Sequence, residues 1–557
     1  MRLSSSRARP AVLLLTLCLS AAYAGTPATP AEMAAYAEKL MDEQKLSRDG
    51  PGVTLLVARG DQLLVETARG MASIELGVPL KPQQLMRIGS VTKQFAAATL
   101  LKLIDEGKAS LDDPLSKFLP DYPNGAHITL LQLLNHTSGV KSYTGIPGYM
   151  AGPIRLDLDT ATLIKQSKDL PVDFAPGASW AYNNSGYVLV GAVIEAISGK
   201  SWHQQMSDAL LAPLKLTDIH YQDSEKLFKG MVQGYTTNDK RETAPADILS
   251  MTQPHAAGAL IGNVEALWHW NQALHGGKIL SAASYQRMIT PEGAAKARGY
   301  GFGIEAGTLR GHPMLQHSGG IHGFNSQLSY LPESQVTVAL LRNSDAGGLN
   351  LGLMARKLAA FAIGEPYPDR KPVDESVAQL KASEGVYVQD KRSRELRVRD
   401  GVLYSQTSGG SSVAMIPLGG ERYGATSSLA EMKIERGADG KVTGLLVFQD
   451  GEGAGEAWKR SGDLPAEKPS VELSAAQKQV LVGDYAAPEF SMKIFVGDKG
   501  ELFAQGSGQP PLAVKAASPR LLWASRVDAT LEFSAEEGAA KTLTLTQGQR
   551  KIVMQRK

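Results

Sequence analysis

Ser90 and Lys93 stand three residues apart, a spacing that could support nucleophilic catalysis. Residues three apart share one face of an α-helix, so the lysine amine would lie beside the serine hydroxyl. A serine hydroxyl becomes a good nucleophile when a base takes its proton, and a lysine whose pKa is lowered by burial can be that base. The alternative is an ordinary helix start, with Ser90 as the capping residue and Lys93 in solvent. The pair alone is a weak signal, because about two such spacings are expected by chance in a chain of this size.

Two other groups of residues could complete such a site. Tyr182 and Asn184 precede an apolar helix predicted over residues 188–197, on an irregular segment where both can face one cavity. Tyr182 could relay protons, and Asn184 could hold a substrate amide. His317 and Gly319 enter a predicted strand hairpin. Glycines there let a substrate backbone approach the strand edge, where main-chain N–H groups can bind an oxyanion.

The same patterns also occur where we expect no catalysis. Ser138 and Lys141 lie in a glycine-containing loop, where no helical turn brings the lysine back to the serine. The tyrosine–asparagine spacing recurs at Tyr122 and Asn124, in a turn. The histidine–glycine pattern recurs at His275, Gly276 and Gly277, after a helix. His136 and His322 are interpreted as structural, because a lone histidine is more often a satisfied polar residue than a catalyst.

The pattern at Ser90 differs from its repeat because a helix follows it. Apolar residues recur at helical spacing over residues 91–106, and Gly107 is a natural stop. Phe95 and the alanines after it are apolar or small. They predict a buried helix start, in which desolvation would lower the pKa of Lys93.

The elements that must position these residues predict an α/β (α+β) domain with a mostly antiparallel sheet flanked by helices. Apolar runs separated by turn residues predict two strand hairpins, residues 53–58 with 62–67 and residues 326–331 with 336–341. Helical patterns occupy residues 32–46 and 349–363, and further helices extend to about residue 290. We assign residues 25–365 to this domain.

A proline-rich segment, residues 366–372, predicts a linker to a region of short strands and glycine-rich turns. This region repeats itself: Gly385-Val386-Tyr387 is echoed by Gly483-Asp484-Tyr485, and two more motif pairs recur at nearly the same offset. We therefore predict two all-β barrel domains, residues 373–462 and 469–557, each closing its own edges.

The composition favours a small-molecule or peptide partner. The 58 lysines and arginines nearly balance the 56 aspartates and glutamates of the 557-residue chain, so neither a nucleic-acid groove nor a polybasic membrane patch is indicated. The histidines lack metal-ligand spacing and no phosphate loop occurs, so no metal or other cofactor is expected. The oligomeric state is left open.

Residues 1–24 are typical of a secretory signal peptide. Arginines precede an apolar run too short to span a bilayer, and Ala22-Tyr23-Ala24 then precedes Gly25. The sole cysteine, Cys18, lies inside this segment, so we expect a mature chain with no disulfide and no thiol nucleophile. We expect an exported protein, periplasmic or secreted, with no membrane anchor after signal removal.

Taken together and in this order, the motifs Ser90-x-x-Lys93, Tyr182-x-Asn184 and His317-x-Gly319 resemble those of the serine β-lactamase and penicillin-binding-protein family. The resemblance spans about residues 30 to 365. It is greatest with the branch that contains class C β-lactamases, D-aminopeptidases, esterases and related peptidases. The two barrels resemble D-aminopeptidase architecture, and the last is similar to lipocalin-like domains of related peptidases.

This resemblance implies a role for each motif residue. Ser90 would be the nucleophile, Lys93 a base or proton relay, and Tyr182 a tyrosine base or relay. Asn184 would hydrogen-bond the acyl side of the substrate, and His317 and Gly319 would line the substrate site. The backbone N–H groups of Ser90 and Gly320 would form the oxyanion hole. The reaction would be acylation of Ser90, followed by hydrolysis of the acyl-enzyme by water.

His317 departs from the family pattern, because β-lactamases and transpeptidases carry a lysine there. A histidine with an ordinary pKa is mostly neutral at pH 7, so substrates with a carboxylate, such as β-lactams, become less favoured. We therefore expect a serine hydrolase that acts as a peptidase or aminopeptidase on short or D-amino-acid peptides. An esterase is the next alternative and a β-lactamase the third. A non-catalytic protein that binds a peptide or ligand with this fold is the alternative of another class.

Overall fold

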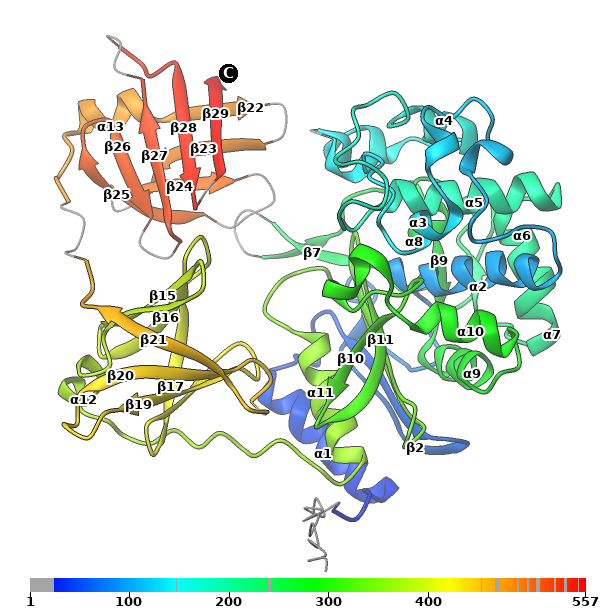
Figure 1. Ribbon diagram of the computed structural model, residues 1–557, viewed down its shortest axis with the longest axis horizontal. Helices are drawn as coiled ribbons and strands as arrows, with labels where there is room; N and C mark the ends of the chain where they lie inside the picture. The colour runs from blue at the N-terminus through cyan, green and yellow to red at the C-terminus, as the bar shows by residue number, and fades with distance from the viewer. Residues whose placement is uncertain are drawn as a thin grey trace, which may run out of the picture.

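The computed structural model describes residues 25–557, except residues 147, 239–241, 452, 466–469, 488–489, 498–499, 507–510, 525–526, 535–537 and 549. The predicted signal peptide, residues 1–24, lies outside the described residues. An α/β domain and two closed β-barrels follow one another along the chain (Figure 1). Among the described residues, no helix has the length and apolar character needed to cross a bilayer.

The first domain is built on a six-stranded sheet whose neighbouring strands are all antiparallel. In spatial order its strands are β10 (Glu305–Leu309), β11 (His312–Ile321), β12 (Phe324–Leu331), β13 (Val336–Arg342), β1 (Val53–Arg59) and β2 (Gln62–Arg69). Both predicted hairpins are confirmed. The strand β10 covers only the first half of β11, because its pairing ends with Glu305 opposite Gln316.

Helices cover both faces of this sheet. On one face lie α1 (Pro30–Glu43) and α11 (Leu351–Ala362), and on the other α2 (Thr92–Asp105) and α9 (Val264–His275). In α1, the buried residues Met33, Ala37 and Leu40 recur at helical spacing and form the stripe that faces the sheet. The sequence prediction of a mostly antiparallel sheet flanked by helices is therefore correct.

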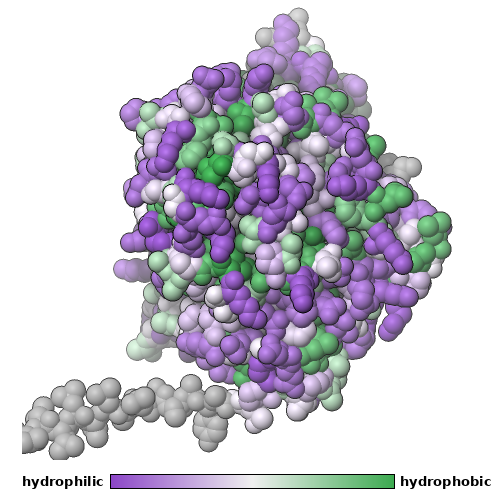
Figure 2. Space-filling view, turned by 90° about the vertical axis from the view of Figure 1, so that its right-hand side faces the viewer, coloured by the Kyte–Doolittle hydropathy of each residue, from purple (hydrophilic) through white to green (hydrophobic). Residues whose placement is uncertain are grey.

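A helical layer lies beyond α2 (Figure 1). Its helices are α3 (Leu130–Leu134), α4 (Thr160–Lys165), α5 (Asn184–Ser198), α6 (Trp202–Met206), α7 (Ala212–Leu214), α8 (His255–Gly258) and α10 (Ala282–Ile289). Short strands link this layer to the sheet: β5 (Met86–Arg87), β9 (Leu260–Gly262) and β6 (His220–Tyr221) form one small sheet. Figure 2 shows the outer face of this layer, where hydrophilic residues are interspersed with small hydrophobic areas.

Two smaller antiparallel pairs complete the first domain. They are β3 (Met71–Ser73) with β4 (Val78–Pro79) and β7 (Tyr235–Thr237) with β8 (Thr243–Pro245). The second pair extends from the first domain on the side where the second barrel lies (Figure 1).

Two closed eight-stranded barrels follow, as the internal repeat predicted. The first comprises β14 (Gly385–Gln389), β15 (Arg392–Arg399), β16 (Val402–Thr407), β17 (Val413–Gly419), β18 (Arg422–Ala425), β19 (Glu431–Arg436), β20 (Val442–Phe448) and β21 (Glu456–Gly462). The second comprises β22 (Gly483–Ala487), β23 (Phe490–Val496), β24 (Leu502–Gly506), β25 (Leu512–Ser518), β26 (Leu521–Ala524), β27 (Ala529–Phe533), β28 (Thr542–Gln547) and β29 (Arg550–Arg556).

The repeated motifs hold equivalent places in the two barrels. A short helix precedes each barrel, α12 (Val377–Lys381) and α13 (Ala475–Leu481), which the sequence analysis did not predict. The buried Tyr387 donates a hydrogen bond to the carbonyl of Ser383 at 2.7 Å, and Tyr485 donates one to the carbonyl of Leu481 at 2.9 Å. Each tyrosine thus ties the first strand of its barrel to the segment just before it.

The predicted linker contains no helix or strand, but two adjacent residues near its middle attach it to both domains. Asp369 forms an ion pair with Lys39 of α1 at 2.8 Å. The guanidinium of Arg370 donates hydrogen bonds to four carbonyl oxygens of the first barrel, those of Ala425, Ser428, Leu429 and Ala430. The linker therefore fixes the start of the first barrel.

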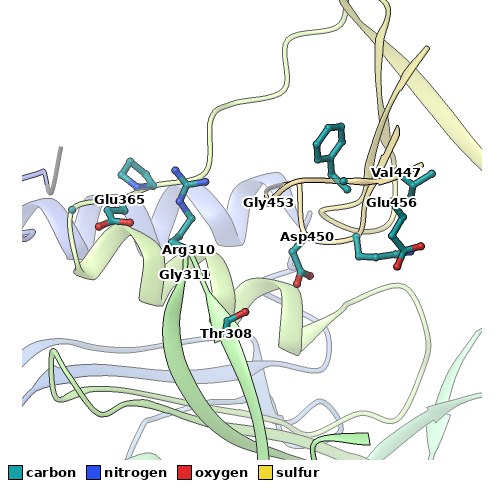
Figure 3. A pocket seen from close by; sticks show the side chains of 13 residues that line it. Thr308, Arg310, Gly311, Glu365, Val447, Asp450, Gly453 and Glu456 are labelled. Carbon is teal, nitrogen blue, oxygen red and sulfur yellow. The ribbon is translucent and has the colours of Figure 1, made fainter. Parts of the chain in front are cut away.

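A cleft of about 970 Å³ separates the first barrel from the sheet domain. Arg310 and Glu365 approach it from the first domain, and Asp450 and Glu456 from the barrel (Figure 3). An ion pair between Arg356 and Asp450 at 3.2 Å joins the two bodies beside the cleft. The interface between the first barrel and the sheet domain is thus lined by charged residues and is not fully closed.

Candidate active site

Ser90 lies in the single 3-10 turn η1 (Gly89–Val91), directly before α2. The turn is held by its neighbours: the amide of Ile88 donates to the carbonyl of Leu260 in β9 at 3.0 Å, and the hydroxyl of Ser326 in β12 donates to the carbonyl of Ile88 at 2.7 Å. Ser90 does not cap the helix. Its side chain is partly exposed and its hydroxyl is contacted by Lys93.

Lys93 is completely buried, which excludes the alternative of a solvated helix lysine. Its Nζ lies 3.1 Å from Oγ of Ser90, 2.8 Å from Oδ1 of Asn184 and 2.8 Å from the carbonyl oxygen of Ala257. Burial lowers the pKa of Lys93 well below its usual value. In the neutral amine, two N–H groups can donate to Asn184 and Ala257, which leaves the lone pair directed toward the hydroxyl of Ser90.

Asn184 is the first residue of α5 and does not lie on the irregular segment that the sequence analysis predicted. The helix begins earlier because the side chain of Asn183 caps it, accepting from the amide of Gly186 at 2.8 Å. The amide side chain of Asn184 is fixed at both ends. Its Oδ1 accepts from Lys93, and its Nδ2 donates to the hydroxyl of Thr144 at 3.2 Å. Asn184 therefore orients the lysine amine.

Tyr182 lies over the same lysine, whose Nζ is 4.7 Å from the centre of the tyrosine ring. The side chain is 38% exposed, so it borders the open side of the site. Desolvation raises the pKa of Tyr182, and the hydroxyl of Ser90 acts in the opposite direction. At neutral pH the phenol is therefore protonated, and its hydroxyl can both donate and accept a hydrogen bond.

His317 is only 2% exposed, and both of its ring nitrogens have partners. Nδ1 lies 2.6 Å from the carbonyl oxygen of Ser318, and Nε2 lies 2.8 Å from the hydroxyl of Tyr300. Burial, with a smaller effect of Lys93, lowers the pKa of His317 to about 3. A neutral imidazole fits both contacts, because Nδ1–H can donate to the carbonyl while Nε2 accepts from the phenol. The predicted role of His317 in substrate binding stays a prediction.

The two glycines that follow in β11 bring this strand against the serine turn. A Cβ added to Gly319 would lie 2.1 Å from the carbonyl oxygen of Ile88, so only glycine fits there. A Cβ on Gly89, whose φ is +50°, would lie 3.0 Å from the amide nitrogen of Gly320. The N–H of Gly320 therefore lies beside the turn that carries Ser90, where the predicted oxyanion hole requires it.

Residues that repeat the motif spacings elsewhere in the chain contact side chains outside the site. Lys141 forms an ion pair with Asp173 at 2.8 Å. His275 contacts the hydroxyl of Tyr285 at 2.9 Å and stacks on Tyr330. Their interpretation as non-catalytic agrees with these contacts.

Sequence reasoning missed Tyr300, and it interpreted His136 as structural. His136 is buried beneath Tyr182 with ring centroids 4.5 Å apart, and Tyr300 packs against both residues. The available signal was the run of alternating glycines around Tyr300. A Cβ on Gly303 would lie 2.7 Å from the backbone of Lys93, so this segment must approach the catalytic helix closely.

Acyl transfer needs a serine with a base in contact and N–H groups beside it for the oxyanion, and the start of α2 together with the adjacent strand β11 supplies them. The fold and this site define the class: the protein is a serine hydrolase. More narrowly, the chain belongs to the Beta-lactamase family, whose model matches residues 33–362. The resemblance predicted from the three motifs is confirmed, and the alternative of a non-catalytic binding protein is not supported.

Individual relatives agree with this assignment. Penicillin-binding protein PbpX of Bacillus subtilis is 28% identical over 290 residues, which are 52% of this chain and 70% of that protein. A D-aminopeptidase of Gluconobacter oxydans is 24% identical over 358 residues, 63% of this chain and 65% of that protein. The crystal structure of a D-stereospecific amidohydrolase from a Streptomyces species is 27% identical with a TM-score of 0.50, and it covers 56% of this chain and 94% of its own.

Proposed function

We propose that this serine hydrolase is an exported peptidase or aminopeptidase that cleaves short peptides or amides of D-amino acids through an acyl-enzyme on Ser90. The observation that carries the mechanism is the buried amine of Lys93, which contacts Ser90, Asn184 and Ala257 at once. Since two of these partners can only accept, a neutral amine has its lone pair available for the proton of Ser90.

The opposite pKa shifts of the two candidate bases favour Lys93 in the acylation step. Desolvation lowers the pKa of Lys93, so its neutral, basic form is populated at a lower pH than that of a solvated lysine. Desolvation raises the pKa of Tyr182, so the phenolate that could act as a base is not populated near neutral pH. Tyr182 then acts as the relay, accepting a proton from one group while it donates its own to another.

The reaction proceeds in two steps. Oγ of Ser90 attacks the substrate carbonyl while its proton passes to Lys93, and the N–H groups of Ser90 and Gly320 stabilise the oxyanion. The carbonyl–nitrogen bond breaks as Tyr182 donates its proton to the leaving amine and takes the proton held by Lys93 in its place. A water molecule then attacks the acyl carbonyl while one of its protons passes to Lys93, the bond between the acyl carbon and Oγ of Ser90 breaks, and this proton returns to Oγ as the acid product leaves.

The substrate class rests on the charge at the third motif and on the relatives. The buried His317, with a pKa of about 3, supplies no positive charge for a substrate carboxylate, which disfavours β-lactams. Two of the reported relatives are named as a D-aminopeptidase and a D-stereospecific amidohydrolase. An esterase is the second candidate, because the same nucleophile and oxyanion groups act on ester carbonyls.

Export is part of the proposal and is supported by the signal-like sequence of residues 1–24. Cleavage after Ala24 would leave a mature chain beginning at Gly25 and place the enzyme in the periplasm or outside the cell. N-terminal sequencing of the protein recovered from these fractions tests this directly. A chain that retains residues 1–24 in the cytoplasm would contradict it.

The test of the mechanism is the intact mass of the protein during turnover of p-nitrophenyl acetate, with wild type beside Ser90→Ala. We expect a transient acetyl adduct on wild type alone and a loss of kcat by at least about 10³-fold in the variant. D- and L-aminoacyl p-nitroanilides then measure amide cleavage and its stereochemistry. Turnover of esters without any anilide would favour the esterase, and equal rates for Ser90→Ala would refute the assignment of the nucleophile.

A further inference from the structure

His136 has a backbone conformation that is uncommon for a residue with a side chain. It follows Asn135, the C-terminal cap of α3, and its φ is +65°, in the left-handed region. Glycine or asparagine is the usual residue at this place after a helix. The histidine is nevertheless 1% exposed. A buried polar residue in this conformation indicates that its side chain makes a contact for which the conformation is kept.

The contacts of His136 surround Tyr182. The carbonyl oxygen of His136 accepts from the amide of Ala181 at 3.2 Å, and Nδ1 of its ring accepts from the amide of Asn183 at 3.2 Å. The imidazole also packs against the ring of Tyr182, with the ring centroids 4.5 Å apart. The backbone on both sides of Tyr182 and its ring are therefore held by one residue.

The amide of Asn183 fixes the tautomer of His136. A backbone N–H can only donate, so Nδ1 is the unprotonated nitrogen and Nε2 carries the proton. Burial, with smaller effects of Lys93 and His317, lowers the pKa of His136 well below its usual value. The ring therefore stays neutral, and Nδ1 keeps its lone pair. Nε2 is buried without a hydrogen-bond partner among the described residues, so the bond at Nδ1 is the polar contact that the ring makes there.

The two asparagines that follow the tyrosine have attachments of their own. The side chain of Asn183 caps α5 and donates to the carbonyl of Val140. Asn184 donates from its backbone amide to the hydroxyl of Ser142 at 3.3 Å, and from Nδ2 to that of Thr144 at 3.2 Å. Loss of the imidazole acceptor should therefore displace the tyrosine more than the amide that orients the catalytic lysine.

The proposed role of Tyr182 depends on its position. The phenol must take a proton from Lys93 and give its own to the leaving amine, and each transfer requires hydrogen-bond distance between the two atoms. The side chain of Tyr182 is 38% exposed, so one side of it borders solvent. The packing that fixes this side chain must come from its buried side, where His136 lies.

We infer that His136 is a positioning residue, which holds Tyr182 for proton transfer to the leaving group by accepting the N–H of Asn183 at Nδ1. This inference rests on the proposed function, in which Tyr182 protonates the leaving amine. His136 moves no proton in this scheme and contacts the phenol rather than the nucleophile. The histidine that the sequence marked only as structural thus has a defined part in the reaction.

The experiment compares two substrates with one acyl group, the p-nitroanilide and the phenyl thioester of D-alanine. The leaving nitrogen of the anilide needs a proton, whereas thiophenolate leaves as the anion. The two kcat/KM values both include acylation, so their ratio reports proton transfer to the leaving group. His136→Phe keeps an aromatic ring and removes the acceptor. It should lower kcat/KM for the anilide about 10- to 100-fold more than kcat/KM for the thioester.

Two variants should keep the ratio of anilide to thioester at its wild-type value. In His136→Asn the side-chain oxygen can accept in place of Nδ1, and asparagine tolerates the left-handed backbone. His275→Phe makes the same change as His136→Phe at a partly buried histidine, which contacts Tyr285 outside the site. Thermal unfolding of each variant measures the general loss of stability.

Tyr182→Phe completes a double-mutant cycle. It removes the phenol hydroxyl and should itself lower the ratio, and His136→Phe in that background should lower the ratio no further. A further fall in the double variant would overturn the inference, because His136 would then act without Tyr182. An unchanged ratio in Tyr182→Phe would refute both the relay and the inference that rests on it.

Other outcomes decide between positioning and simple packing. Equal losses for the two substrates in His136→Phe would show that His136 only supports the fold, and would overturn the inference. The same holds if His136→Asn lowers the ratio as much as His136→Phe, because the effect would then belong to the ring and not to Nδ1. Should His136→Phe not fold, His136→Gln replaces it, since the longer side chain carries its amide past the position of Nδ1.

The failure of the peptidase function would be recognised separately. A wild type that cleaves the thioester but no anilide would refute the peptidase. The methyl ester of D-alanine then replaces the anilide, because methoxide also needs a proton to leave. A ratio of methyl ester to thioester that falls in His136→Phe and persists in His136→Asn would retain the positioning role in an esterase. A ratio unchanged in both variants would overturn it.

Discussion

At the scale of single residues, the site depends on a lysine whose pKa is lowered by burial. Lys93 is enclosed by Asn184, Ala257 and the ring of Tyr182, and its position one turn after Ser90 brings its amine to 3.1 Å from the hydroxyl. The same residue on an exposed helix would be a solvated cation and no base. The catalytic property therefore comes from the surroundings of the lysine and not from its type.

The pH dependence of kcat/KM for a neutral ester should report this lysine. Lys93 is protonated below its lowered pKa and neutral above it, so activity should rise with pH through that pKa and then stay level toward pH 10. His317, with a pKa of about 3, does not titrate in this range, and the raised pKa of Tyr182 keeps the phenol protonated.

Glu305→Gln serves as the control for this profile, because Glu305 has a raised pKa of its own. The rise should persist in that variant if it belongs to Lys93. Activity that continues to increase up to the ordinary lysine pKa of about 10.4 would show that burial does not neutralise the amine.

At the scale of elements, the site is assembled where the turn η1 and the strand β11 meet. Gly319 packs on the carbonyl of Ile88 and on the hydroxyl of Ser326, and this hydroxyl also holds the turn. The separation between Ser90 and Gly320 is therefore set by the absence of a side chain at Gly319. A strand with any larger residue at this position would be pushed away from the nucleophile.

Gly319→Ala should separate the two elements. The added Cβ would lie 2.1 Å from the carbonyl oxygen of Ile88 and 2.2 Å from Oγ of Ser326, so the backbone must move. We expect a loss of kcat on the order of 10²-fold, as for removal of an oxyanion donor, and a destabilisation of about 1–3 kcal/mol from overpacking.

The matched control is Gly307→Ala on the neighbouring strand β10, where an added Cβ meets no atom within 4 Å. Ester hydrolysis and thermal unfolding measure both variants. If Gly319→Ala behaves like Gly307→Ala, the close contact between β11 and the serine turn does not determine the oxyanion hole.

At the scale of the whole molecule, the described residues of the barrels are joined to the hydrolase domain away from its candidate site. The hydrogen-bonding and ring partners found for Ser90, Lys93, Tyr182, Asn184 and His317 all come from residues of the first domain. The first barrel is attached through the linker, the Arg356–Asp450 ion pair and the edges of an open cleft. Catalysis and barrel stability should therefore be separable.

Arg370→Ala tests this separation in the full chain. The guanidinium donates to four barrel carbonyls and forms an ion pair with Glu431 at 3.4 Å, so its loss should lower the free energy of unfolding of the first barrel by about 2 kcal/mol. Calorimetry should show a shift of one transition, with kcat for p-nitrophenyl acetate unchanged. Lys371→Ala, an exposed neighbour, is the control. A joint shift of all transitions, or a loss of activity, would show that the barrel supports the site.

The sequence alone was informative wherever the signal was local. Apolar spacing predicted the two hairpins of the sheet and the helix after Ser90, because periodicity directly reflects which face is buried. The repeat around Tyr387 and Tyr485 predicted two barrels with a similar sequence pattern and fold. The start of α5 was predicted four residues too late, since Asn183 to Gly186 are polar or small and give no periodic pattern.

The sequence by itself determined the family and marked Ser90 and Lys93 as the candidate nucleophile and base, because three short motifs in a fixed order carry that information. Only the tertiary structure decided what surrounds them. Tyr300 and the carbonyl of Ala257 are brought to His317 and Lys93 from other segments of the chain. The burial and the pKa of the site residues, and so the charge that the site presents to a substrate, depend on contacts between segments far apart in the chain. Such contacts leave no local pattern in the sequence.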